Sequence, residues 1–366
     1  LESLPANRRM TEARRLALEE VRQPFKLESG PLMRAHLFRL GQDEHLLALA
    51  WHNIVFDAAS EDPFCAELNA LYAAYSRGAV VELPEPSIQY ADFAHWQREL
   101  PQGEELATAL AYWKSKLAGK PDTLGLPTDR PEPAIRTLRG GCVRLELGEE
   151  LSKAVRRMSE AAGVKPYAVL MATLQTLLNR YTGQDVTIGV LEAGRSAPQT
   201  ADAIGFFVNT LPLHTDLSGN PPFREALGRV ARSLEEAWAH GELPFENIVR
   251  LLQPERALSR NPLFRIMFVM QAAPLRALAL PGLQVAAEEM FAESTGLDLT
   301  LFATEHGEDF QLRAEYSLDL FDAETIQRLL RNFRQLLASA VHQPQTPLGA
   351  LELLSPQDRE QVLFAL

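Results

Sequence analysis

The spacing of apolar residues along this chain predicts an interleaved series of strands and helices. Short apolar runs bounded by turn residues predict strands at 32–40, 44–56, 140–147, 185–193, 209–217, 263–271, 283–291, 297–305 and 310–318. Apolar positions three and four residues apart predict helices at 9–23, 64–75, 90–100, 105–119, 149–163, 166–183, 222–241 and 326–337. Strands interleaved with helices, with some hairpins among them, favour an α/β fold with mixed sheets.

Candidate chemistry stands where the predicted strand 44–56 ends. The stretch HNIVFDA (52–58) carries His52 and Asp57 directly before a predicted helix. A His five residues before an Asp is a weak pattern by itself, because core packing or a turn hydrogen bond explains it more often than a site does. The residues around it therefore decide its meaning.

Composition limits the class of protein. The 366 residues are 46% apolar and 23% charged with a net charge of −12, which is typical of a globular protein and lacks the basic excess of a nucleic-acid binder. This length exceeds what one core comfortably holds, so two lobes are expected. No apolar run of about 18 residues predicts a membrane span. Cys65 and Cys142 fit reduced thiols of a cytoplasmic protein.

Two other chemistries are disfavoured by their spacing. GVLEAGRS (189–196) imitates a phosphate-binding loop, but Pro198 follows where a helix should begin. The histidines are scattered without a His-x-x-x-His pair, so no metal site is predicted. The segment 120–133 contains four prolines and resists regular structure, which makes it the expected lobe boundary.

Several blocks, in order and over nearly the whole chain, resemble the condensation domains of nonribosomal peptide synthetases. HNIVFDA occupies the place of the family signature HHxxxDG. The further blocks are SIQYADFAHWQREL, YWKSKLAG, LPTDRPEP, IGVLEAGR, IGFFVNTLPLHTDL, HGELPFENIVRLLQPERALSRNPLFRIMFVMQ and YSLDLFDAETIQRLLRNF. IGFFVNT, LPFE and SRNPLF are together highly specific, and the wording is closest to the branch that joins two L-residues.

The resemblance implies two chloramphenicol-acetyltransferase-like lobes, each with a mixed β-sheet flanked by helices, in a V around a central tunnel. We expect an N-terminal lobe at 1–125, a C-terminal lobe with crossover segments at 126–352, and a linker towards an adenylation domain at 353–366. The family normally carries a further N-terminal segment, so the first lobe is expected to be incomplete and the chain to be a piece of a longer polypeptide.

The resemblance also implies a reaction. An acyl thioester and an amine, tethered to the phosphopantetheine arms of upstream and downstream peptidyl carrier domains, form an amide, and the domain itself binds no cofactor. The second His of the signature acts as a general base or orients the amine, and the Asp pairs with an arginine. Asn53 and Asp57 hold these positions here, with Arg195 as the expected partner. Because a carboxamide takes up no proton near neutral pH, catalysis is expected to be impaired.

The remaining candidates belong to the same motif or to IGFFVNT. His52 cannot replace the missing base, because neighbouring residues of a strand point to opposite faces. Ala58 replaces the signature Gly, at a cost of about 1 kcal/mol if its backbone is left-handed. Gly205, Phe207 and Asn209 are candidates for the tunnel wall and for contact with phosphopantetheine. Packing of Phe207 and turn chemistry at Asn209 are the structural alternatives.

A second function stays open. Some condensation-like domains lack the active His and recruit a tailoring oxygenase, a cytochrome P450 or a β-hydroxylase, to a carrier-bound residue. Asn53 and Ala58 motivate this alternative. Epimerisation is disfavoured, because epimerisation domains usually keep the second His. The sequence does not identify the donor or the acceptor.

Overall fold

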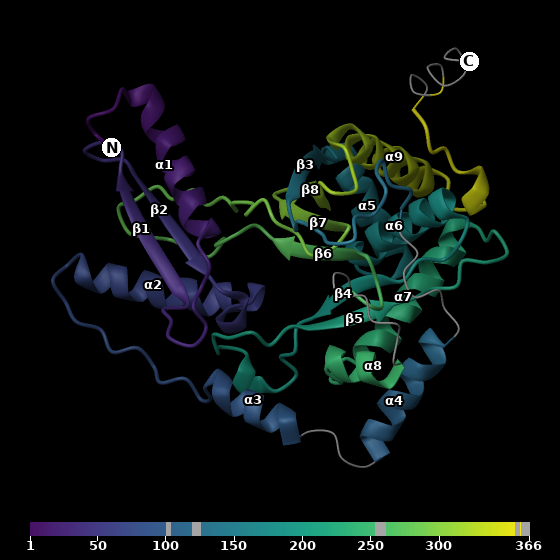
Figure 1. Cartoon of the computed structure of the whole chain (residues 1–366), viewed down its shortest axis with the longest axis horizontal. Coiled ribbons are helices and arrows are strands. Elements are labelled where there is room, and N and C mark those ends of the chain that lie inside the picture. Colours follow the sequence, from purple (N-terminus) through teal and green to yellow (C-terminus); the bar gives the residue numbers. More distant parts are fainter. Residues whose placement is uncertain (100–103, 119–125, 253–260, 356–358, 360–366) are drawn as a thin grey trace. The chain divides into compact units, whose positions relative to one another are not determined.

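The computed structural model describes residues 1–99, 104–118, 126–252, 261–355 and 359, which form two compact units built from discontinuous segments (Figure 1). Unit 1 comprises the described residues of Leu1–Glu99, Arg195–Val208 and Pro274–Ala292. Unit 2 comprises those of Leu100–Gly194, Asn209–Ala273 and Glu293–Leu366. Two segments of unit 1 are therefore excursions from the second half of the chain.

The expected division into lobes at 1–125 and 126–352 and a linker at 353–366 stays a prediction. The predicted boundary after residue 125 and most of the predicted linker 353–366 lie outside the described residues. The described residues between Leu100 and Gly194 belong to unit 2, and the later segments Arg195–Val208 and Pro274–Ala292 belong to unit 1. Helix α4 (Glu104–Leu117) belongs to unit 2 because its Trp113 and Leu117 are buried in the hydrophobic core of that unit.

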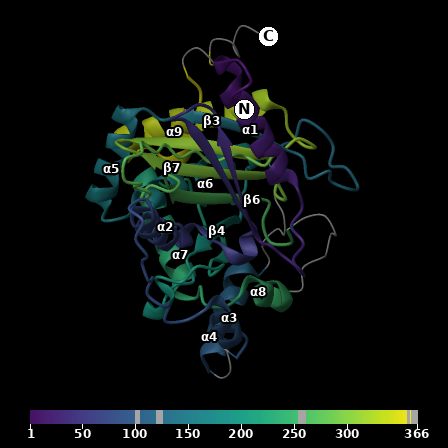
Figure 2. The same cartoon turned by 90° about the vertical axis from the view of Figure 1, so that its left-hand side faces the viewer.

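Unit 1 is built around a two-stranded antiparallel hairpin and three helices. The elements are α1 (Ala6–Arg22), β1 (Met33–Arg39), β2 (His45–Trp51), α2 (Glu61–Tyr75) and α3 (Tyr90–Glu99). Helix α1 lies alongside the hairpin (Figure 2) and buries Ala13 and Ala17, which are four residues apart and share one helix face. The helix ends one residue before Gln23, whose backbone turns extended ahead of Pro24.

Unit 2 contains a six-stranded mixed sheet in the order β3-β8-β7-β6-β4-β5. The strands are β3 (Gly140–Glu146), β4 (Ile188–Glu192), β5 (Asn209–Leu213), β6 (Ile266–Ala272), β7 (Leu299–His306) and β8 (Asp309–Ser317). β6 pairs in parallel with β4 and β7, and the other neighbours are antiparallel. The predicted hairpin at 306–309 joins β7 to β8, with Gly307 at a φ of 59°.

Helices cover the sheet of unit 2 (Figure 1). They are α5 (Glu149–Ala162), α6 (Pro166–Thr182), α7 (Phe223–Ala239), α8 (Phe245–Leu252) and α9 (Ala323–His342). α6 is buried along most of its length, and α9 buries a stripe that includes Ile326, Phe333 and Leu337. The predicted α/β class, a mixed sheet flanked by helices, is confirmed.

One predicted strand, 283–291, is wrong. Its alternating apolar residues fit a strand pattern, but none of the described strands pairs with it, and residues 281–289 are all exposed. A strand needs a hydrogen-bonding neighbour as well as a pattern. Leu283 and Val285 therefore remain on the surface of a segment of unit 1 without regular secondary structure.

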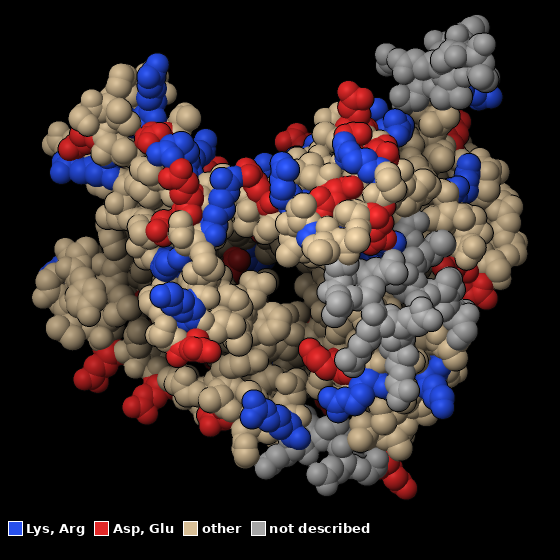
Figure 3. Space-filling model, in the orientation of Figure 1, with Lys and Arg blue, Asp and Glu red and all other residues tan. Residues whose placement is uncertain are grey.

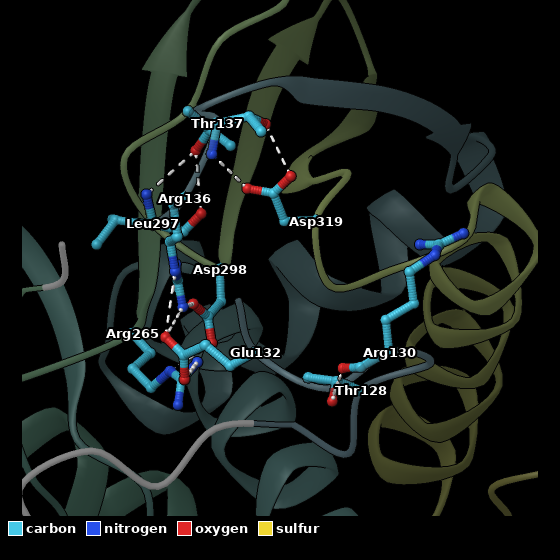
Figure 4. A network of polar contacts seen from close by, with 10 residues as sticks. Thr128, Arg130, Glu132, Arg136, Thr137, Arg265, Leu297, Asp298 and Asp319 are labelled. Atoms are coloured by element: carbon cyan, nitrogen blue, oxygen red, sulfur yellow. Dashed lines mark hydrogen bonds and ion pairs between the residues drawn. The ribbon is translucent and has the colours of Figure 1, made fainter. Parts of the chain in front are cut away.

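A buried ion-pair network holds the segment that leads into the sheet of unit 2 (Figure 4). Arg136 and Arg265 both pair with Asp298, at 2.7 and 2.5 Å, and both contact Glu132, at 2.8 and 3.1 Å. Asp298 directly precedes β7, so the network ties residues 132–136 to the beginning of that strand. Such pairs are costly to break singly, because the remaining charge stays buried.

The surface carries both signs of charge. On the face that Figure 3 shows, acidic and basic side chains are interspersed, and no single sign dominates. Among the described residues, no helix combines the length and apolar character that a membrane crossing requires.

Candidate functional site

The predicted strand 44–56 ends early, and a turn carries the motif. β2 stops at Trp51, and Asn53–Val55 form a 3-10 turn. His52 caps this turn, because its Nδ1 accepts a hydrogen bond of 3.1 Å from the backbone nitrogen of Ile54. This hydrogen bond from the backbone to a nearby side chain competes with the backbone hydrogen bonds that would continue the strand.

His52 and Asn53 do not lie in a strand, so the alternation of strand residues does not explain how their side chains are placed. Asn53 is exposed, whereas His52 is half-buried with its ring edge-on to Phe25 at 5.8 Å. The Nδ1 of His52 serves as the acceptor of the cap, so in the neutral ring the proton lies on Nε2. The two side chains differ in environment because of the cap and not because of strand alternation.

Asp57 and Ser60 form a reciprocal capping box around the next 3-10 turn, Ala58–Ser60. The backbone nitrogen of Ser60 donates to Asp57 Oδ1 at 2.9 Å, and the hydroxyl of Ser60 contacts the same oxygen at 2.7 Å. Helix α2 follows at once, with Glu61 and Asp62 in its first turn. The junction between strand and helix is therefore rigidly tied at Asp57.

Asp57 and Arg195 form a buried ion pair. Arg195 Nη2 lies 2.8 Å from Asp57 Oδ1, and the two side chains are 8% and 3% exposed, respectively. The backbone nitrogen of Phe207 donates to Asp57 Oδ2 at 2.9 Å. With the two contacts from Ser60, the carboxylate accepts four hydrogen bonds and has a structural role.

The excursion 195–208 is organised around Arg195. Its Nη1 donates to the carbonyl oxygens of Thr200 and Ala203, and its Cζ lies 4.2 Å above the ring of Phe207. One guanidinium therefore closes its own loop and ties that loop to Asp57.

Gly205 and Phe207 lie next to the ion pair. A Cβ on Gly205 would stand 2.6 Å from Tyr90 Cδ2, so only glycine allows this close approach. Phe207 is 1% exposed and packs against Tyr90 and Phe93 of α3. Its contact with a tunnel stays a prediction, and the exposed neighbours are Ile204 and Phe206.

Asn209 lies in unit 2, where its side chain holds the loop after α7. Its Nδ2 donates to the carbonyl oxygens of Gly241 and Leu243, at 2.7 and 2.8 Å. Its Oδ1 accepts from the backbone nitrogen of Phe245 at 3.1 Å. Both amide hydrogens are thus used within the chain, and the predicted bond to pantetheine would have to compete with them.

The backbone conformation of Ala58 bears on the expected cost of replacing the signature Gly. Ala58 lies in a right-handed 3-10 turn and is not among the described residues with positive φ. The condition for the cost of about 1 kcal/mol at this position, a left-handed backbone, is therefore not met. Ala58 is exposed beside Asp57 and its methyl group meets no backbone penalty.

Burial dominates the electrostatics near the motif. It raises the pKa of Tyr90, which the charge of Asp57 raises further. It also raises the pKa of Glu61, although the backbone nitrogen of Leu275 donates to that carboxylate. Among the described residues, no group of three His, Cys, Asp or Glu side chains is arranged to hold a metal ion.

The structure thus brings Asp57, Arg195, Gly205 and Phe207 together in unit 1 and leaves Asn53 exposed on the adjoining turn. Sequence reasoning missed Ser60. The spacing of Asp57 and Ser60, three residues apart before a helix, is the capping-box signature that could have revealed it.

The α/β fold and the motif turn agree with the family to which the sequence is assigned. The chain belongs to the condensation domain family, whose model matches residues 3–363. It is 43% identical over 359 residues to one of the linear gramicidin synthase proteins of Brevibacillus parabrevis, a match that covers 97% of this chain but only 5% of that much longer relative. The family predicted from the sequence blocks is confirmed.

Solved structures agree with this assignment. The X-domain from teicoplanin biosynthesis has a TM-score of 0.84 and 31% identity, with 93% of this chain and 78% of that chain covered. The complex of the X-domain and OxyB from teicoplanin biosynthesis gives 0.83 and 30%, covering 94% and 78%.

Proposed function

We propose that this chain is a condensation-type domain of a nonribosomal peptide synthetase, which forms an amide at a reduced rate because Asn53 occupies the place of the reactive His. The observation that carries the proposal is the intact Asp57–Arg195 scaffold beside an exposed Asn53. The 43% identity to a gramicidin synthase supports the reaction class.

The proposed step joins a carrier-tethered acyl or peptidyl donor to a carrier-tethered aminoacyl acceptor. The amine nitrogen attacks the thioester carbonyl, the C–N bond forms, the C–S bond breaks, and the proton lost by nitrogen ends on the thiolate. Tethering both partners supplies proximity, which accounts for most of what remains of the rate. The Oδ1 of Asn53 accepts a hydrogen bond from the amine and orients it, but it removes no proton. The missing base reduces the rate by about 10²–10⁴-fold.

The proposed partners follow from this reaction. Upstream and downstream peptidyl carrier domains deliver the phosphopantetheine arms, and an adenylation domain loads the acceptor carrier. The arms are tethered substrates, and the domain itself holds no cofactor.

The test compares Asn53 variants in the complete protein with loaded donor and acceptor carriers. Asn53→His is expected to raise the rate of amide formation by about 10²-fold, and Asn53→Ala to lower it further by removing the orienting oxygen. Single-turnover product formation measures both. Wild-type and Asn53→His proteins that both form no amide above background would contradict the proposal.

A second candidate function is recruitment of a tailoring oxygenase, a cytochrome P450 or a β-hydroxylase. The similarity to an X-domain that was solved in complex with OxyB favours it. Calorimetry with oxygenases of the same gene cluster is the direct measurement. Recruitment predicts micromolar or tighter binding that Asn53→His leaves unchanged, because a docking surface does not depend on the residue at the reacting centre. Absence of binding to every such oxygenase would refute this candidate.

A further inference from the structure

Ser60 stands at the centre of the network around Asp57, and the proposed chemistry does not use it. Its side chain is fully buried, with 0% exposure. Its Oγ lies 2.7 Å from Asp57 Oδ1, 3.0 Å from Arg195 Nη2 and 3.0 Å from the backbone nitrogen of Gly205. A serine hydroxyl donates one hydrogen and accepts two, so these three contacts fill its capacity, and the 3.5 Å contact from the backbone nitrogen of Asp57 is a longer, additional one.

The hydroxyl joins two stretches of chain that are distant in sequence, the motif turn and the excursion 195–208. Ser60 itself belongs to the motif turn, Arg195 lies 135 residues later and Gly205 lies 145 residues later. The carbonyl oxygen of Gly205, also 3.0 Å away, is an alternative acceptor for the same hydrogen. Attraction between charges depends weakly on direction, whereas hydrogen bonds weaken steeply as they bend. The hydroxyl therefore adds a directional contact to each member of the Asp57–Arg195 pair, beside the hydrogen bond that the two make with each other.

A short connection leads from this network to the turn that carries Asn53. Phe56 is the single residue between that turn and Asp57, and its backbone nitrogen donates to the carbonyl oxygen of Asn53 at 3.3 Å. The ring of Phe56 stacks on Trp51 at 4.5 Å. Phe56, which directly precedes Asp57, therefore contacts both the first residue of the turn and the end of β2.

We propose that Ser60 is a positioning residue: its hydroxyl orients the Asp57–Arg195 pair and thereby holds the Asn53 turn in the geometry that the reaction requires. The kinetic part of this inference rests on the proposed function. The effect on the turn does not, so the two can be tested separately.

The first measurement is amide hydrogen exchange in the complete protein, resolved at Val55 and Phe56. Ser60→Ala removes the hydroxyl, and Ser60→Cys keeps the shape of the side chain, with a larger sulfur atom that is only a weak donor and acceptor. Both variants are expected to speed exchange at these two amides by about tenfold, although neither amide contacts Ser60. Ser60→Cys carries the test if Ser60→Ala does not fold.

Ser152→Ala is the matched control. Ser152 is also fully buried, contacts Asp309 Oδ1 at 2.6 Å and accepts from the backbone nitrogen of Phe310 at 3.0 Å, but it lies in unit 2. Its loss should destabilise the protein without changing exchange at Val55 and Phe56. Unchanged exchange in the Ser60 variants, or equal acceleration in Ser152→Ala, would overturn the inference.

The second measurement uses the Asn53→His protein, in which the reaction is expected to be faster. Adding Ser60→Cys should lower kcat for amide formation about ten- to a hundredfold and change KM less than about twofold, whereas adding Ser152→Ala should change neither. Faster exchange together with an unchanged kcat would refute positioning for the reaction. Faster exchange with no amide formed by Asn53→His itself would refute the proposed function and leave the role of Ser60 in the turn intact.

Discussion

Replacement of Asp57 with alanine tests the buried scaffold directly. The carboxylate accepts from Arg195 at 2.8 Å, from Phe207 at 2.9 Å, and twice from Ser60. Its removal leaves a guanidinium 8% exposed without its counter-charge and leaves neutral donors without an acceptor. Breaking a buried pair on one side costs about 3–5 kcal/mol. Asp57→Asn should cost less than Asp57→Ala, because one acceptor oxygen remains for four donors.

Urea denaturation followed by tryptophan fluorescence measures this loss, because Trp51 stacks on Phe56, the residue directly before Asp57. The control is Glu288→Ala in the same unit. Glu288 also pairs with an arginine at 2.8 Å, but Arg14 and Glu288 are 52% and 56% exposed. An exposed pair contributes about 0–1 kcal/mol and weakens in salt. If Asp57→Ala costs no more than Glu288→Ala, the reasoning from burial is wrong.

Four smaller changes follow from the same structure. Burial raises the pKa of Glu192, so its ionised form destabilises the folded state. Glu192→Gln should therefore raise the free energy of unfolding at pH 7. The gain should vanish below about pH 4, where Glu192 is protonated in both the folded and the unfolded protein. No gain at pH 7 would contradict this. Gly205→Ala should cost about 1–3 kcal/mol in thermal denaturation by forcing a methyl group against Tyr90. Gly228→Ala, in open space on α7, should instead add about 0.5–1 kcal/mol. Ala58→Gly should lower stability by up to about 1 kcal/mol; an increase would restore the idea of backbone strain.

Local patterns predicted most elements of this fold. They were wrong where a side-chain hydrogen bond ends a strand and where a predicted strand lacks a pairing partner. The strand expected to reach Phe56 ends at Trp51, because the ring of His52 offers the backbone an acceptor that a strand would not use. The strand expected at 283–291 fails for lack of a pairing partner among the described strands. Periodicity reports which face a residue prefers, and neither event changes the periodicity.

The site shows the same limit at longer range. His52 and Asp57 stand close together in the sequence, where their spacing is a weak pattern by itself, whereas the contacts of Asp57 with Arg195 and Phe207 span 138 and 150 residues. Spacing carries no information over such distances, and Arg195 was expected only because of the family resemblance. Ser60 lies within a recognisable capping box, yet its bonds to Arg195 and Gly205 emerge only from the folded chain.

The side chain of Asn53 makes none of the contacts that hold the Asp57–Arg195 pair, so Asn53→His should leave that pair intact. None of the four hydrogen bonds to Asp57 comes from the side chain of Asn53, and Asn53 itself is exposed. A histidine at this position would replace no buried contact in the described structure of unit 1. Asn53→His should therefore change the free energy of unfolding by less than about 0.5 kcal/mol, as surface changes usually do. Urea denaturation of the same protein used for the rate measurement checks this. A loss above about 1 kcal/mol would mean that the turn has adapted to asparagine, and a failure of Asn53→His to speed the reaction would then report on folding rather than on the missing base.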